Sequence, residues 1–433
     1  MITSSRDTRG DLRPLRTGQC VAIIGGGPAG SSCALALKRQ AEALDRNVRV
    51  VLFEPKDFHN ESNVCVGVLS PPFGHLLAEL GLSLPPEIVQ RRITAYELHT
   101  DGAHLTLPER EGAEEQTLVV DRGDLDLFLL QSAQSAGVEL LHEAVADLKL
   151  VRDGVTVLGD KGTVLFCDVV VGAFGLTRVG LSSFESRTLY QAPGLMRSLL
   201  TDIPLPDATV DEHVGNHIHA LLQASQPTVE FAALTPKRGH VTVNVAGPSI
   251  GPAELEVSIA HMQLFGLLPD KLPPAPRYGN VFPAGPARHI YRDRVVTIGN
   301  TSGLLRPLKG KGINAGMLTG MRAARAMLEA GISREAFDYY YQACRDITSD
   351  YSYGLFLRRL YHVSRSLGVL DAVIDLACRE ETLRRCFYNM VAGEGSYRDV
   401  VFGLLRPLLW LRITGAVARF ESARLFGRNQ ARR

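Results

Sequence analysis

A glycine-rich loop near the start of the chain has the residue types and spacing of a phosphate-binding turn. It lies between the apolar run 20–24 and a helical pattern over 28–43, and it reads Gly25-Gly26-Gly27-Pro28-Ala29-Gly30. The first glycine permits a tight turn, the third lets a pyrophosphate approach the backbone, and the last lets helix and strand pack closely. Free amides and the positive end of the helix dipole favour an anion there. We therefore expect the phosphates of a dinucleotide at this loop.

Glu54 follows a second apolar run, 49–53, and completes the pattern. An acid at this point accepts hydrogen bonds from the ribose of an adenosine nucleotide. Because strand, loop, helix, strand and acid occur in this order, we interpret 20–54 as a dinucleotide-binding unit rather than a simple glycine turn.

A second glycine-rich loop follows the apolar run 295–299 and leads into another helical pattern. Its defining residues are Gly299, Asn300, Pro307, Gly310, Lys311, Gly312 and Ile313. This stretch resembles the second FAD signature of the geranylgeranyl reductase family, whose members are built like aromatic-ring hydroxylases, and the order of elements fits over nearly the whole chain. The resemblance implies that Asn300 hydrogen-bonds the ribityl chain of FAD. It also implies that the amides of Gly310, Lys311 and Gly312 face the pyrimidine edge of the isoalloxazine ring.

The helix that starts at Gly312 would stabilise negative charge on a reduced flavin through its N-terminus. Lys311 would add a positive charge if its side chain points inward, and is otherwise a solvated surface lysine. Two acids of the family pattern are replaced, by Asn300 and by Phe174, which follows the apolar strand 169–172. Asparagine still accepts a hydrogen bond from a hydroxyl, whereas phenylalanine makes no polar contact.

Cys65 and Arg122 take their candidate roles from the same resemblance. The segment 63–71 is similar to the family's Cys-Gly-Gly segment, which lies against the flavin beside the substrate cavity. Cys65 is therefore our candidate at the reaction centre, as a proton relay or as a small buried side chain. Arg122 stands where relatives place an arginine over the pyrophosphate or adenine, and the alternative is a solvated residue at a helix start.

Residues 231–236 align with a family segment, Tyr-x-Trp-x-Phe-Pro, that lines the isoprenoid cavity. Only one aromatic residue, Phe231, and the proline, Pro236, remain. The loss of these aromatic residues predicts a wider or differently shaped pocket, and it leaves the identity of the substrate undetermined.

The order of patterns predicts an α/β fold, in which a Rossmann-like FAD-binding domain is interleaved with an antiparallel-sheet substrate domain and followed by a helical C-terminal region. The continuous apolar strand 169–172 is typical of a parallel sheet, whereas 94–120 alternates as a smaller antiparallel sheet does. The expected division is an N-terminal tail 1–19, an FAD-binding domain in the three parts 20–93, 121–189 and 291–332, a sheet insertion 94–120, a substrate domain 190–290 and a helical region 333–433.

Composition narrows the class of protein. A chain of 433 residues with 45% hydrophobic residues and a net charge of +1 can bury a large core. The polar segment 1–19 does not resemble a signal peptide, so we expect a cytoplasmic protein. Seven scattered cysteines without CxxC spacing indicate free thiols. We expect no metal site, and interpret His213, His217 and His219 as solvated or hydrogen-bonded histidines rather than ligands.

Positive charge is concentrated toward the C-terminus. Residues 300–433 carry 21 Lys and Arg, 19 of them Arg, against 12 Asp and Glu, whereas the remainder has a net charge near −8. No nucleic-acid recognition fold is indicated, so an anionic membrane surface is the favoured partner. One helical face over 410–420 is apolar, with Arg412 and Arg419 opposite, and comprises Trp410, Ile413, Val417 and Phe420. This helix either makes a peripheral membrane contact or docks on the protein's own core.

These features favour an FAD-dependent oxidoreductase in which reduced FAD delivers hydride to a C=C bond of an isoprenoid or other apolar substrate. A second GxGxxG loop is absent from the sequence, so electrons would come from a ferredoxin-like carrier or a transiently bound NAD(P)H. Two alternatives stay open. One is a flavin-dependent monooxygenase of a small organic substrate, and the other is a degenerate flavoprotein that acts as a binding or assembly protein.

Overall fold

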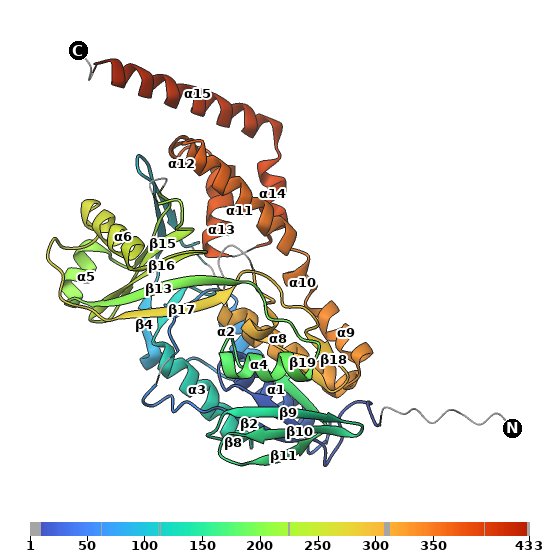
Figure 1. The fold of residues 1–433 in the computed structure, drawn as a ribbon. Helices are drawn as coiled ribbons and strands as arrows, with labels where there is room; N and C mark the ends of the chain where they lie inside the picture. The colour runs from blue at the N-terminus through green and yellow to red at the C-terminus, as the bar shows by residue number, and fades with distance from the viewer. Residues whose placement is uncertain are drawn as a thin grey trace.

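A six-stranded sheet forms the base of the molecule, at the lower end of Figure 1. The computed structural model describes residues 10–430 except 62, 111, 113, 224–225, 307–311 and 394. Five strands run parallel, and a short antiparallel strand closes one edge. In sheet order they are β18 (Tyr291–Arg292), β19 (Val295–Thr297), β12 (Val169–Gly172), β1 (Cys20–Ile24), β2 (Arg49–Phe53) and β8 (Glu139–Leu141).

Both faces of this sheet are covered, which is why its strands are apolar throughout. Val21 and Ile23 of β1 pack against a layer of helices, whereas Ala22 and Ile24 pack against a small antiparallel meander. The helices are α1 (Pro28–Ala43), α3 (Arg122–Ser135) and α8 (Gly312–Glu329), and the meander is β9 (Val145–Val151), β10 (Gly154–Gly159) and β11 (Val164–Cys167). The predicted α/β class is confirmed.

A seven-stranded sheet lies between this base and the helical C-terminal region (Figure 1). Helices α5 (Asp207–His213) and α6 (Pro252–Leu264) cover one of its faces. Its strands, in order, are β17 (Arg277–Pro283), β13 (Leu195–Pro204), β16 (His240–Gly247), β15 (Phe231–Lys237), β14 (His217–Leu221), β5 (Ala95–His99) and β6 (His104–Pro108). The shorter elements are β3 (Val68–Leu69), β4 (Val89–Arg92), β7 (Leu118–Val120), α2 (Phe73–Glu79), the 3-10 turn Pro86–Ile88, α4 (Arg178–Arg187) and α7 (Gly299–Ser302).

One expectation about strands was wrong. Segment 94–120 is not a sheet of its own, because β5 and β6 form the edge of the seven-stranded sheet and β5 pairs in parallel with β14. Strand β5 is paired along both edges, with β6 and β14, and residues 95–98 are all buried. The proline-rich stretch 269–286 contains strand β17, whose edge position tolerates the flanking prolines. The domain boundaries themselves stay a prediction.

Helices form the remainder of the chain: the first two lie against α8 and the base, and the others pack against the outer strands β5 and β6. They are α9 (Arg334–Ala343), α10 (Arg345–Thr348), α11 (Tyr351–Ser366), α12 (Leu370–Ala377), α13 (Glu381–Ala392), α14 (Tyr397–Leu404) and α15 (Pro407–Gln430). Figure 1 shows α15 at the end of the molecule farthest from the base. Among the described residues no single helix is long and apolar enough to cross a membrane, while α14 and 407–420 together reach that length and composition and meet at 71°.

Candidate functional site

A cavity of about 1370 Å³ extends from the two glycine-rich loops to α15. Most of the candidate residues line its inner end: Gly25, Gly27, Pro28, Ala29, Glu54, Cys65, Arg122, Gly299, Asn300, Gly312 and Ile313. Gly30 lies just behind the first loop, and Pro307, Gly310 and Lys311 lie outside the described residues. The structure therefore brings together residues that are almost 290 positions apart in the chain.

The first loop has the geometry that its glycines predict. Gly25 has a φ of +107°, and a Cβ there would lie 2.4 Å from the Ala173 carbonyl oxygen. A Cβ at Gly30 would lie 1.8 Å from the Gly25 oxygen, so helix α1 can pack here only on glycine. Gly27, by contrast, has open space beside its Cα, with no atom within 4 Å of a Cβ. It is the N-cap of α1, so the first free amides of the helix lie at the cavity.

The Glu54 carboxylate is fixed against this loop. One oxygen accepts a 2.7 Å hydrogen bond from the Gly26 amide, and the other accepts a 3.0 Å bond from the Lys56 amide. Burial raises the pKa of Glu54, although the two amides oppose that rise. Each oxygen keeps one more acceptor direction, which suits hydroxyl donors in the cavity.

Arg122 is not the solvated start of a helix. Its side chain is 15% exposed, and its Nε donates a 2.8 Å hydrogen bond to Asp126, which is fully buried. Burial acts to lower the pKa of Arg122, but Asp126 and a hydrogen bond with Cys65 hold that pKa above its ordinary value. Asp126 in turn accepts a 2.5 Å bond from Asn63. Arg122 and Cys65 therefore meet at the cavity, and Asp126, which sequence reasoning missed, fixes the arginine.

The second loop reaches the cavity because α8 packs closely on α1. A Cβ at Gly320 would lie 2.5 Å from the Ala29 carbonyl oxygen, and one at Gly299 would lie 2.7 Å from the Ala29 Cβ. Gly299 has a φ of +59°, and its amide donates to Thr319 at 2.9 Å. The Asn300 side chain lies against the start of α8, with its Oδ1 3.0 Å from where a Gly312 Cβ would be.

Phe174 fills its position with packing instead of charge. It is 7% exposed and contacts Phe184 and Tyr190, at ring-centroid distances of 4.8 Å and 6.4 Å. Tyr190 donates a 2.7 Å hydrogen bond to the carbonyl of Thr301, beside Asn300. The aromatic cluster therefore holds the second loop in place where the family has an acid.

Beyond the loops the cavity becomes a chamber under the seven-stranded sheet. Alternate residues of each strand line it, as the pleat of a strand requires, and they include Met196, Ser198 and Leu200 on β13, Ile218 and Ala220 on β14, and Phe231, Ala233 and Thr235 on β15. Helices α11 to α15 form the opposite wall, with Leu360, Phe387, Trp410, Ile413 and Val417. The apolar face of α15 thus turns toward the cavity, where Trp410 stays 41% exposed and Ile413 and Val417 are half-buried.

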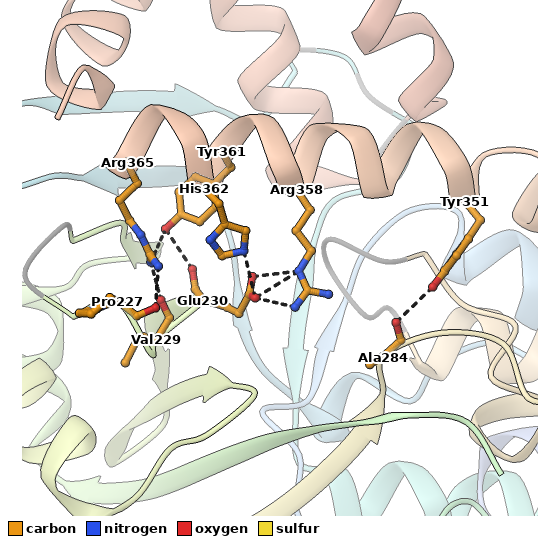
Figure 2. A network of polar contacts seen from close by, with 9 residues as sticks. All are labelled: Pro227, Val229, Glu230, Ala284, Tyr351, Arg358, Tyr361, His362 and Arg365. Atoms are coloured by element: carbon orange, nitrogen blue, oxygen red, sulfur yellow. Dashed lines mark hydrogen bonds and ion pairs between the residues drawn. The ribbon is translucent and has the colours of Figure 1, made fainter. Parts of the chain in front are cut away.

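Helix α11 is held over the sheet by a network of polar contacts, drawn in Figure 2. The Glu230 carboxylate accepts from Arg358 Nε at 3.1 Å and Nη2 at 2.5 Å, and lies 3.1 Å from His362 Nε2. Arg365, which is 7% exposed, donates to the carbonyls of Val229 and Pro227 at 2.5 and 2.8 Å. Because Glu230 and Arg358 line the cavity, this network, which sequence analysis did not find, closes its wall.

The three histidines singled out in the sequence each contact protein groups. His213 lies 2.8 Å from the Gly266 carbonyl oxygen, and His217 lies 3.0 Å from Glu97. His219 bonds His99 and the Val214 carbonyl at 3.0 and 3.1 Å. Within the described part of the chain, no group of three or more His, Cys, Asp or Glu side chains has the arrangement of a metal site.

No protein-family model matches the chain. It is 25% identical over 345 residues to digeranylgeranylglycerophospholipid reductase 1 of Methanosphaera stadtmanae, a match that covers 76% of this chain and 80% of that protein. It is also 25% identical over 415 residues to the digeranylgeranylglycerophospholipid reductase of Methanothrix thermoacetophila, a match that covers 90% of this chain and 96% of that protein. A geranylgeranyl bacteriochlorophyll reductase-like protein of Thermoplasma acidophilum superposes with a TM-score of 0.70 at 15% identity. The match covers 94% of this chain and 99% of that one. The chain is therefore similar to members of the geranylgeranyl reductase family over most of its length.

Other solved structures share the fold at similarly low identity. The flavin-dependent brominase Bmp2 superposes with a TM-score of 0.68 at 16% identity, covering 88% of this chain and 98% of that one. The p-nitrophenol 4-monooxygenase PnpA of Pseudomonas putida DLL-E4 superposes with a TM-score of 0.64 at 18% identity. The match covers 88% of this chain and 100% of that one. The protein is a flavin-dependent oxidoreductase.

The family's aromatic segment is the place where this chain departs most from the pattern. Ala233 and Thr235 stand at the tryptophan and phenylalanine positions, and both side chains line the chamber. Two large rings are therefore absent from the cavity wall. The predicted change in pocket shape falls on residues that face the cavity.

Proposed function

We propose that the protein is an FAD-dependent reductase that adds hydrogen across a C=C bond of an isoprenoid or a similarly long apolar molecule. The observation that carries this proposal is the continuity of one cavity from the glycine-rich loops, past Cys65, to the apolar chamber. Pockets for a single drug-sized ligand occupy roughly 300–1,000 Å³. A cavity of about 1370 Å³ has room for a dinucleotide and a long chain together.

The residues present fit FAD. The open side of Gly27 and the amides at the start of α1 would hold the pyrophosphate, and the fixed Glu54 carboxylate would hold the ribose. Asn300 and the start of α8 at Gly312 would contact the flavin end. Bound and reduced FAD supplies the hydride.

The chain's own residues position the substrate and control protons. The apolar walls of the chamber exclude water and hold a hydrocarbon chain. Arg122 places a permanent positive charge beside the cavity, fixed by Asp126. Cys65 lies beside that charge and lines the cavity, where its Sγ can hold and return a proton.

The first test is an absorption spectrum of the purified protein, followed by anaerobic reduction and re-oxidation in air. Flavin bands with slow re-oxidation, and loss of one C=C bond from a C20 isoprenoid per two electrons, are expected. A protein that cannot be reconstituted with FAD would contradict the proposal. Reduction by a ferredoxin-like carrier and by NADPH, compared side by side, identifies the electron donor.

A flavin-dependent monooxygenase is the second candidate. The fold shared with p-nitrophenol 4-monooxygenase and the missing aromatic rings at Ala233 and Thr235 favour it. Oxygen consumption in a fixed ratio to substrate turnover would select this function over the reductase.

We further propose that the apolar substrate reaches the cavity from an anionic membrane surface. Leu405, Leu408 and Leu411 at the α14–α15 bend are 54%, 72% and 69% exposed, and the exposed Arg406 and Arg419 accompany them. Leucine beside arginine is typical of helices that lie in a membrane interface. The α15 residues Trp410 and Ile413 line the cavity, so a docked bilayer would lie near its outer end.

Flotation with vesicles tests this contact. The protein is expected to float with vesicles that contain phosphatidylglycerol, and less with pure phosphatidylcholine or at high salt. Leu408→Glu with Leu411→Glu should abolish flotation while the FAD content is unchanged. Unchanged flotation of the double variant would contradict the placement of the membrane contact at these leucines.

A further inference from the structure

Four polar side chains lie in a row on the sheet wall of the chamber. Thr235, Asn244, Ser198 and Asn280 lie on the neighbouring strands β15, β16, β13 and β17, and all four line the cavity. Ser198 is paired directly with Asn280 across the two strands. We call these four residues the polar stripe.

The polar stripe has unused hydrogen-bonding capacity. Ser198 Oγ donates to Asn244 Oδ1 at 2.5 Å, which leaves the Asn244 amide nitrogen as a donor without a partner among the described residues. Thr235 is 1% exposed, and no hydrogen bond joins its hydroxyl to another described residue. A buried hydroxyl without a partner is costly, and Asn244, which is half-buried, also lines the cavity. These groups are typical of a site that receives a hydrogen-bond partner from a ligand.

One end of the polar stripe is attached to the reaction centre. Asn280 Nδ2 donates a 2.6 Å hydrogen bond to the carbonyl of Val64, the residue before Cys65. The β14 side of the same sheet face offers Ile218, Ala220 and Leu222 to the cavity. The chamber thus has a polar side that starts beside Cys65 and an apolar side next to it.

We propose that the polar stripe is a subsite for a carbonyl or hydroxyl oxygen of the substrate, close to the reacting bond. This inference rests on the proposed function, and it narrows the substrate class from any apolar chain to an oxygenated one. The Asn244 amide and the Thr235 hydroxyl donate to that oxygen, while the hydrocarbon part lies along β14 and the helices. A pure hydrocarbon would leave both donors unpaired, and the chamber therefore discriminates against it.

Ligand binding tests the subsite without turnover. Trp410 is the single tryptophan of the chain and lines the cavity, so its fluorescence reports binding to the FAD-loaded protein. The probes are two matched pairs in the same detergent: geranylgeraniol with the C20 hydrocarbon that lacks its hydroxyl, and decan-2-one with decane. Thr235→Val and Asn244→Leu remove the donors at nearly constant volume. Thr235→Ser keeps the hydroxyl, and Ala220→Val changes the apolar side as a control.

Each donor removal is expected to weaken binding of the oxygenated probe by about five- to tenfold and to leave its oxygen-free partner unchanged. Thr235→Ser should retain the affinity, and Ala220→Val should affect both members of a pair equally. Equal effects of Thr235→Val and Asn244→Leu on both members, or no effect, would overturn the subsite. Discrimination with decan-2-one alone, without binding of either C20 probe, would support the subsite while contradicting the isoprenoid function. FAD content and melting temperature, measured first, exclude variants that fail to fold.

Discussion

The Asn280 side chain donates a hydrogen bond to the Val64 carbonyl and so ties an edge strand of the seven-stranded sheet to the segment that carries Cys65. The two groups are 2.6 Å apart, although 216 positions separate them in the chain. Cys65 also contacts Arg122 on α3. The candidate reaction centre is therefore assembled from three separate parts of the fold, and its geometry depends on contacts between them.

Gly27→Val is expected to remove the flavin without unfolding the protein. Gly27 has a φ of −67°, which valine adopts, and no atom lies within 4 Å of the added Cβ. The side chain would project into the space that a pyrophosphate needs. The measurement is the flavin content after reconstitution, together with a melting temperature of the apoprotein that stays within a few degrees of wild type.

Gly320→Ala is the matched control for that variant. Its Cβ would lie 2.5 Å from the Ala29 carbonyl oxygen, so α8 must move away from α1. Overpacking of this kind costs about 1–3 kcal/mol of unfolding free energy. Loss of stability in Gly27→Val, or retained flavin, would contradict the placement of the pyrophosphate.

Asp126→Ala should be one of the more destabilising single changes near the site. It leaves the Arg122 guanidinium without its carboxylate and Asn63 without its acceptor. Removing one partner of a buried ion pair costs about 3–5 kcal/mol, which urea unfolding of the apoprotein measures. Asp124→Ala, an exposed change on the same helix, should cost much less. Equal effects of the two would show that Arg122 does not depend on Asp126.

Local patterns in the sequence predicted the nucleotide-binding half of the site well. Helix α1 has the predicted bounds Pro28–Ala43, and α8 begins at the predicted Gly312. These elements follow from glycine geometry and hydrophobic periodicity, which are properties of neighbouring residues. The roles of the individual site residues toward FAD stay predictions.

Contacts between distant segments were beyond such reasoning. Nothing near Asp126 in the sequence indicates that it would be fully buried beside Arg122. Strand β5 was assigned to a separate small sheet, because alternation shows that a strand is half-buried but not which strand pairs with it. Glu230 is a single acid before a strand, and only the fold brings it to Arg358.

Acid is expected to weaken the fold through His99. Burial lowers the pKa of His99 to about 3, and the neighbouring His219 and His104 add to this effect. The unfolded chain binds a proton near pH 6.5, whereas the folded state does not, so stability falls as the pH drops through 6.5 and continues to fall toward 3. Between pH 7 and pH 5, His99 is expected to lower the free energy of unfolding by about 1–2 kcal/mol.

Unfolding free energies measured across that pH range check the effect. His99→Phe should flatten the dependence, because the substituted ring still stacks on Phe265 but does not titrate. His75, on the surface, makes a suitable control, because contact with Glu115 raises its pKa and gives a dependence of opposite sign. An unchanged slope in His99→Phe would show that this ring is not the titrating group.

The ion pair between Glu230 and Arg358 is expected to show strong energetic coupling, because it closes the cavity wall and both side chains are largely buried, at 12% and 20% exposure. A double-mutant cycle with Glu230→Gln and Arg358→Gln measures it, and a coupling energy of about 1–3 kcal/mol is expected for such a pair. The exposed pair of Asp375, on α12, and Arg379, just after that helix, should show little coupling in the same assay. Coupling of the buried pair no stronger than that of the surface pair would contradict this expectation. The hydrogen bonds from Arg365 to the carbonyls of Val229 and Pro227 would then hold α11 in place. In that case Arg365→Leu would be the change that releases the helix.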